Sequence, residues 1–175
     1  DDMADTRVVT VIEGGAVAVG GTISSALHGY RGSWPQASSS THAAKIGMAG
    51  GNGSLMRTLP VALAYPDRDR MLRQAARISA MTHWDSQAEV CCGVYCLWIA
   101  ELLSGASLRD GWHTAVEEGR VWAEQSRATP ETPGPEKLPP GFWALLHGFP
   151  ETPIDELQPR GGYAGFVVGC LDAVV

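Results

Sequence analysis

The residues of this sequence that are best placed to do chemistry lie in one glycine-rich stretch, Gly47-Met-Ala-Gly-Gly-Asn-Gly-Ser-Leu-Met-Arg-Thr-Leu-Pro60. Gly50, Gly51 and Gly53 lack a Cβ, so the backbone here can approach a ligand closely. The residues that follow predict a helix start, whose first N–H groups and positive dipole end can bind a phosphate. A simple tight turn is an equally ordinary reading. The stretch lacks the Lys-Ser/Thr ending of a Walker loop, and it lacks the strand-loop-helix context of a dinucleotide-binding site.

A second motif, Ser79-Ala-Met-Thr-His83, begins about 25 residues after this loop. In order and spacing, Gly51-Asn-Gly-Ser-Leu-Met-Arg57, Pro60 and this second motif resemble the ADP-ribosylglycohydrolase family. The upstream segment Gly20-Gly-Thr-Ile-Ser-Ser-Ala-Leu27 and the pair Gly162-Tyr163 are similar to two further segments of that family. The resemblance covers residues 1–126 and 160–175.

The resemblance implies an all-α protein that hydrolyses the bond between ADP-ribose and an acceptor, with two Mg²⁺ or Mn²⁺ ions as cofactors. ADP-ribose or an ADP-ribosylated substrate is then the expected partner. The implied substrate-binding residues are Gly51, Asn52, Gly53 and Ser54 near the ribose and phosphates, with His83 and Tyr163 beside the nucleotide.

Each implied role has an ordinary structural alternative. His83 could be a hydrogen-bonded interfacial histidine or a neighbour of a helix cap, and Tyr163 a half-buried aromatic residue. Met56 and Arg57 are expected to support the loop. For Arg57 we favour a structural ion pair, with Glu13, Asp67 or another carboxylate, over direct phosphate contact.

The acidic motifs through which the family binds its metals are missing from this sequence. Neither Thr-Asp-Asp-Thr nor Gly-x-Asp-x-Asp-Thr occurs, and Asp1-Asp2 lies too close to Gly20 and lacks the flanking threonines. We therefore assign no catalytic and no metal-binding residue, and we expect the segment alone to be inactive. The alternative function is a non-catalytic relative that binds ADP-ribose or is purely structural, like the lens crystallins that resemble this family.

The segments on either side of these motifs are predicted to be helices. Asp67, Asp85 and Ser107 are expected to cap three of them, ending near Met81, Leu103 and Ser126, and the second is apolar on nearly all sides, as in the centre of a bundle. Thr22 is expected to cap a helix through Leu27 to Tyr30. A short helix is predicted at 142–147, and for 7–12 we favour a helix over a strand. The fold class is thus an all-α orthogonal multi-helix bundle of the ADP-ribosylglycohydrolase type.

Proline-rich residues 127–141 predict an exposed connector within a single partial domain that spans residues 1–175. The apolar ending, 163–175, has no cap or polar tail, so we expect the domain to be truncated at both ends. With a net charge of −6 and 13 scattered basic residues, the chain has no patch for polymeric nucleic acid. No segment is long enough to span a membrane, and a cytoplasmic location is expected. Cys91, Cys92 and Cys96 are expected to be small buried apolar residues.

Overall fold

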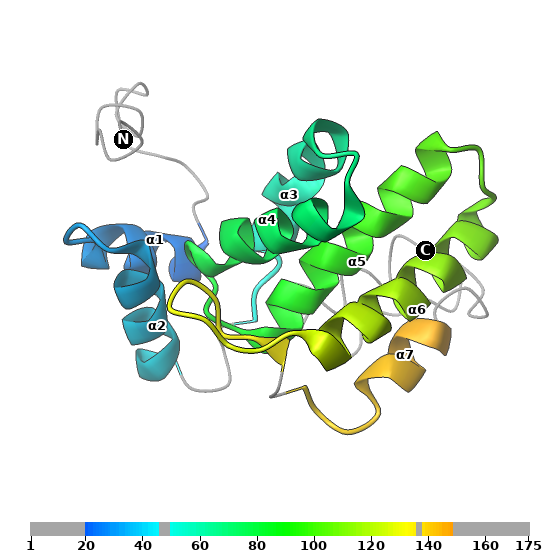
Figure 1. Cartoon of the computed structure of the whole chain (residues 1–175). Coiled ribbons are helices and arrows are strands. Elements are labelled where there is room, and N and C mark those ends of the chain that lie inside the picture. Colours follow the sequence, from blue (N-terminus) through cyan, green and yellow to red (C-terminus); the bar gives the residue numbers. More distant parts are fainter. Residues whose placement is uncertain (1–19, 46–49, 136–137, 149–175) are drawn as a thin grey trace.

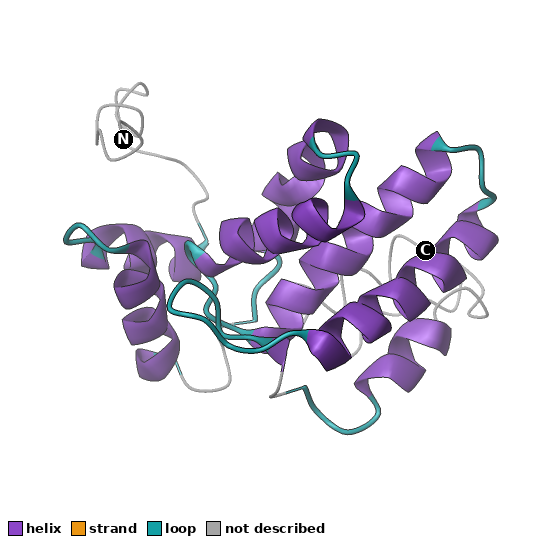
Figure 2. Cartoon of the chain, viewed as in Figure 1, coloured by secondary structure: helices purple, strands orange, loops and turns teal. Residues whose placement is uncertain are grey.

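A computed structural model describes residues 20–45, 50–135 and 138–148 of the chain. The regular elements in these three ranges are all helices (Figure 2). They are α1 (Gly21–Gly29), α2 (Trp34–Ala44), α3 (Gly53–Ala64), α4 (Arg68–Ala80), α5 (Ser86–Leu103), α6 (Leu108–Gln125) and α7 (Phe142–Gly148). The predicted all-α class is confirmed. The predictions for residues 7–12 and 163–175 lie outside the described residues.

Helix α5 forms the centre of the bundle because nearly all of its faces are apolar. It packs against α3, α4 and α6, and α7 lies beside α6 (Figure 1). Its residues Val90, Cys92, Val94 and Leu97 are at most 1% exposed. The central position predicted for this helix is therefore confirmed, as is the burial of the three cysteines.

Three helices begin at the residues predicted to cap them. The side chains of Asp67, Asp85 and Ser107 accept hydrogen bonds from the backbone N–H groups of Arg70, Ala88 and Asp110 respectively. Thr22 is different, because α1 starts at Gly21 with Gly20 as its cap residue, and no side chain of the described residues caps it. The prediction that Thr22 caps this helix is wrong.

Helix α2, which the sequence analysis did not predict, attaches the α1–α2 pair to α4. Its buried face consists of the small residues Ala37, Ser38 and Thr41, so the helix has little apolar pattern to reveal it. The Ser38 hydroxyl donates a 2.5 Å hydrogen bond to the carbonyl of Ala80, the last residue of α4. This bond fixes α2 against the end of α4, next to Thr82 and His83.

None of the helices in the described ranges is both long and apolar enough to cross a membrane.

Candidate functional site

The glycine-rich loop leads directly into α3, as predicted. Asn52 is the N-cap residue, and the first backbone hydrogen bond of the helix runs from the Met56 N–H to the Asn52 carbonyl, at 3.2 Å. The N–H groups of Gly53 and Ser54 lie in the first turn, where a helix offers no backbone carbonyl to accept from them. The loop thus presents a positive helix end, which is the chemistry required for an anion.

The fold brings His83 against this loop, although 30 positions separate it from Gly53. A Cβ placed on Gly53 would lie 3.2 Å from Cε1 of the His83 ring and 2.8 Å from Cδ1 of Ile23 in α1. Only glycine fits here without displacing a neighbour. Ile23 is a part of the site that the sequence analysis did not single out, and only its place in the Gly20–Leu27 segment pointed to it.

Arg57 joins α3 to the end of α4. Its Nη2 donates to the carbonyl of Ile78 at 2.7 Å, to that of Ser79 at 3.4 Å and to Oγ1 of Thr82 at 2.6 Å. A cation at these last carbonyls also complements the negative end of the α4 dipole. Burial lowers the pKa of the guanidinium from its ordinary value.

The predicted structural role of Arg57 therefore has partners other than the expected carboxylates. Its described partners are two carbonyls and a hydroxyl. Asp67 instead caps α4, where it accepts from the Arg70 N–H at 2.8 Å. Glu13 lies outside the described residues.

His83 is a buried, hydrogen-bonded histidine. The residue is 2% exposed, and its Nδ1 lies 2.8 Å from Oγ1 of Thr82. Burial, and after it the positive charge of Arg57, lowers the pKa of His83 to about 4. The imidazole is therefore neutral at physiological pH, and it is suited to hydrogen bonding rather than to ion pairing.

Buried polar groups of α3 and α5 hydrogen-bond to Ser54, at the end of the loop. Ser54 is fully buried; its hydroxyl accepts from Sγ of Cys92 at 3.6 Å, and its carbonyl accepts from the Thr58 hydroxyl at 2.6 Å. Burial raises the pKa of the Cys92 thiol, so this cysteine stays protonated and acts as a hydrogen-bond donor. Ser54 is thus engaged within the protein, and its backbone is the part of it that can face a ligand.

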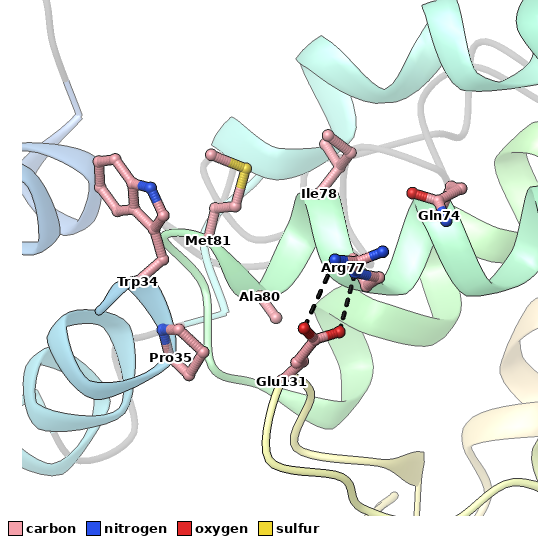
Figure 3. A pocket seen from close by; sticks show the side chains of 8 residues that line it. All are labelled: Trp34, Pro35, Gln74, Arg77, Ile78, Ala80, Met81 and Glu131. Carbon is pink, nitrogen blue, oxygen red and sulfur yellow. Dashed lines mark hydrogen bonds and ion pairs between the residues drawn. The ribbon is translucent and has the colours of Figure 1, made fainter. Parts of the chain in front are cut away.

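A pocket of about 270 Å³ lies beside this site, between α2, α4 and the proline-rich segment (Figure 3). Trp34, Pro35 and Met81 line one side of it, and Arg77 and Glu131 form an ion pair across the other, with Nε and Oε2 2.9 Å apart. The lining includes neither the residues of the loop nor His83. The pocket therefore does not coincide with the site predicted from the sequence.

The residues gathered at the loop do not fit two divalent cations. Mg²⁺ and Mn²⁺ require carboxylate and other oxygen ligands, whereas this site combines a guanidinium, a neutral imidazole, a hydroxyl and a thiol. In the described ranges, no group of three or more His, Cys, Asp or Glu side chains is placed to hold a metal. No step of a reaction is therefore derived through a metal from these residues.

The predicted site residues are thus placed unevenly. Gly51, Asn52, Gly53, Ser54 and His83 come together at the start of α3, whereas Tyr163 lies outside the described residues. Thr82, for which no separate role was predicted from the sequence, bonds to both Arg57 and His83. Its position directly before His83 was the only available signal.

The family model for ADP-ribosylglycohydrolase matches residues 4–175. No curated protein and no solved structure matches the chain significantly. Because the family model spans nearly the whole chain, the chain belongs to the ADP-ribosylglycohydrolase family.

Proposed function

We propose that this chain forms one wall of a cleft that binds the ADP-ribosyl group of ADP-ribosylated substrates. The observation that carries the proposal is the meeting of the α3 N-terminus with His83, at a glycine where a Cβ would press on Ile23 and on the His83 ring. Backbone N–H groups at a helix start suit the phosphates of ADP-ribose. A neutral imidazole suits a ribose hydroxyl or a phosphate oxygen.

Hydrolysis of the ADP-ribosyl linkage is the activity we propose for the protein in a form that also carries acidic residues for two Mg²⁺ or Mn²⁺ ions. In the family these ions polarise the ribose and position the attacking water. The residues described above bind and orient the substrate without supplying that chemistry. Family membership and the geometry of the loop support this division of roles.

The second candidate is an ADP-ribose-binding protein without hydrolase activity. Two observations favour it: the family's acidic motifs are missing from the sequence, and the donor set at the loop does not suit a metal. Both candidates require ADP-ribose binding. They differ only in turnover.

Isothermal titration calorimetry with ADP-ribose tests the shared step. We expect saturable binding by the 175-residue chain, and a loss of affinity of about tenfold or more in Gly53→Ala, because the added methyl group displaces His83 or Ile23. Gly148→Ala is the matched control, since no atom of the described residues lies within 4 Å of a Cβ at Gly148. Its affinity should equal that of the unmodified chain.

Turnover separates the two candidates. Release of ADP-ribose from ADP-ribosylated arginine or serine peptides with Mg²⁺, by this chain or by a longer natural protein that carries it, supports the hydrolase. Binding without release from any linkage supports the binding protein. If the chain shows no heat of binding and no release of ADP-ribose, both candidates are contradicted and a structural role is left.

A further inference from the structure

We infer that Thr82 is a positioning residue that fixes the tautomer of His83, so that Nε2 carries the ring proton and Nδ1 is the acceptor. The inference rests on the bonds that Thr82 makes to Arg57 and His83. It depends on the proposed function only for what His83 then does to a ligand.

Thr82 must be the acceptor in its hydrogen bond with Arg57. A guanidinium has five N–H donors and no acceptor. The 2.6 Å contact between Nη2 of Arg57 and Oγ1 of Thr82 therefore uses a lone pair of the hydroxyl oxygen. The hydroxyl proton of Thr82 must point elsewhere.

The hydroxyl proton of Thr82 is buried and needs an acceptor within the protein. Thr82 is only 5% exposed, so a hydroxyl proton without an acceptor would be costly. Among the residues that the structure describes, the partners of Oγ1 are Arg57 and His83. Since Arg57 cannot accept, the proton is donated to Nδ1 of His83 at 2.8 Å, and the ring proton resides on Nε2.

Further hydrogen bonds of Arg57 keep this arrangement in place. Arg57 cannot turn away easily, because the same Nη2 also donates to the carbonyls of Ile78 and Ser79 at the end of α4. Burial, together with the positive charge of Arg57, disfavours a protonated ring and lowers the pKa of His83 to about 4. Helix α4, Arg57, Thr82 and His83 thus form one connected series of bonds.

The tautomer of His83 determines which ligand atoms the ring can bond at the loop. Cε1, the ring atom bonded to Nε2, would lie 3.2 Å from a Cβ on Gly53, so the uncharged N–H donor at Nε2 lies near the start of α3. Such a donor selects an acceptor oxygen, as in a hydroxyl or a phosphate, without the ionic-strength dependence of a charged group. A ligand with an amine or amide N–H at this point would find no acceptor on the ring.

Long-range ¹H–¹⁵N correlation spectra of the ¹⁵N-histidine-labelled chain, without any ligand, test the inference at pH 7. His83 is assigned by its disappearance in His83→Gln. We expect a single Nε2–H tautomer in the unmodified chain. A predominant Nδ1–H tautomer, an even mixture or a charged ring in the unmodified chain would overturn the inference, and the variant serves only to assign the signal.

Two variants make the test specific to the hydroxyl. Thr82→Val is close to isosteric and removes the donor to Nδ1, so the second tautomer should become populated and ADP-ribose affinity should fall by about tenfold. Thr82→Ser should retain both the single tautomer and the affinity. A folded Thr82→Val protein with an unchanged tautomer contradicts the inference. If no form binds ADP-ribose, the proposed function fails, but the tautomer of the free chain still decides this inference.

Discussion

At the residue scale, the buried neutral ring of His83 makes the stability of the chain depend on pH. In the unfolded chain His83 has the ordinary pKa of 6.5, whereas burial and Arg57 lower its pKa in the folded chain to about 4. The unfolded state therefore binds a proton more readily between these two values, and the folded state loses stability as the pH falls from 6.5 towards 4. From pH 7 to pH 5 the expected loss is about 2 kcal/mol in the free energy of unfolding.

Urea denaturation at pH 7 and pH 5 measures this loss. Other groups also titrate in this range, so the His83 contribution is the difference between the unmodified chain and His83→Gln, which keeps a hydrogen-bonding side chain but does not titrate. The variant should be less sensitive to pH by about 2 kcal/mol over the same interval. Equal pH sensitivity of the two proteins would show that His83 is charged or exposed in the folded chain.

The sequence predicted which residues meet at the loop better than it predicted how they bond. Gly51 to Ser54 and His83 were found because their types and spacing match a family motif. The partners of Arg57 were not found, because a sequence shows candidate carboxylates but not the free carbonyls at the end of α4. Thr82 was missed for the same reason, since both of its bonds depend on the approach of α3 to α4.

At the element scale, capping residues and apolar periodicity predicted the helices that pack around α5. Asp67, Asp85 and Ser107 each begin a helix because a side-chain oxygen meets an otherwise unpaired N–H. Helix α2 could not be predicted from periodicity, because its buried face is made of Ala, Ser and Thr, and its anchor is a hydrogen bond to α4. Its signals were the Ser33 cap and a proline in the first turn.

The interface between α5 and α6 depends on one glycine in the middle of α6. A Cβ on Gly119 would stand 2.6 Å from Cγ2 of Val94, a fully buried residue of α5. Alanine normally stabilises a helix relative to glycine by about 0.5–1 kcal/mol. Here overpacking should outweigh that gain, so Gly119→Ala should lower the free energy of unfolding by about 1–3 kcal/mol.

Thermal or urea unfolding, with Gly148→Ala beside it, checks the effect at Gly119. Gly148 ends α7, and no atom of the described residues would lie within 4 Å of its Cβ, so the control shows the effect of the substitution without a contact like that with Val94. The control should be neutral or slightly stabilising. A Gly119→Ala protein as stable as the unmodified chain would mean that α5 and α6 can separate at no cost.

At the scale of the whole molecule, the proline-rich segment is bound to the bundle rather than exposed along its length. The prediction of an exposed connector is wrong for Thr132, Gly134 and Pro135, which are buried. After α6 the chain turns back towards α2 and α4 (Figure 1). Composition correctly excluded a regular helix or strand over residues 127–134, but it could not reveal the polar groups of α5 that bind this backbone.

Those groups are Ser86 and Glu89 in the first turn of α5. The Ser86 hydroxyl donates to the carbonyl of Gly134 at 2.6 Å, and Oε2 of Glu89, a residue only 2% exposed, accepts from the Gly134 N–H at 3.0 Å. Gly134 has a φ of +74°, a left-handed conformation that favours glycine. The ion pair of Arg77 with Glu131 is a weaker attachment, because both side chains are more than half exposed.

Removing the buried attachment should therefore release the segment while the helices stay folded. Glu89→Ala leaves the buried Gly134 N–H without this acceptor, at a cost of about 1–3 kcal/mol, so trypsin should cut after Arg127 several-fold faster than in the unmodified chain. Glu131→Ala, which removes only the exposed ion pair, is the matched control and should change the free energy of unfolding by less than about 1 kcal/mol and the cleavage rate little. Circular dichroism shows whether the helices persist. Equal cleavage rates in Glu89→Ala and Glu131→Ala would mean that the surface ion pair holds the segment as firmly as the buried carboxylate, which the exposure of the two sites argues against.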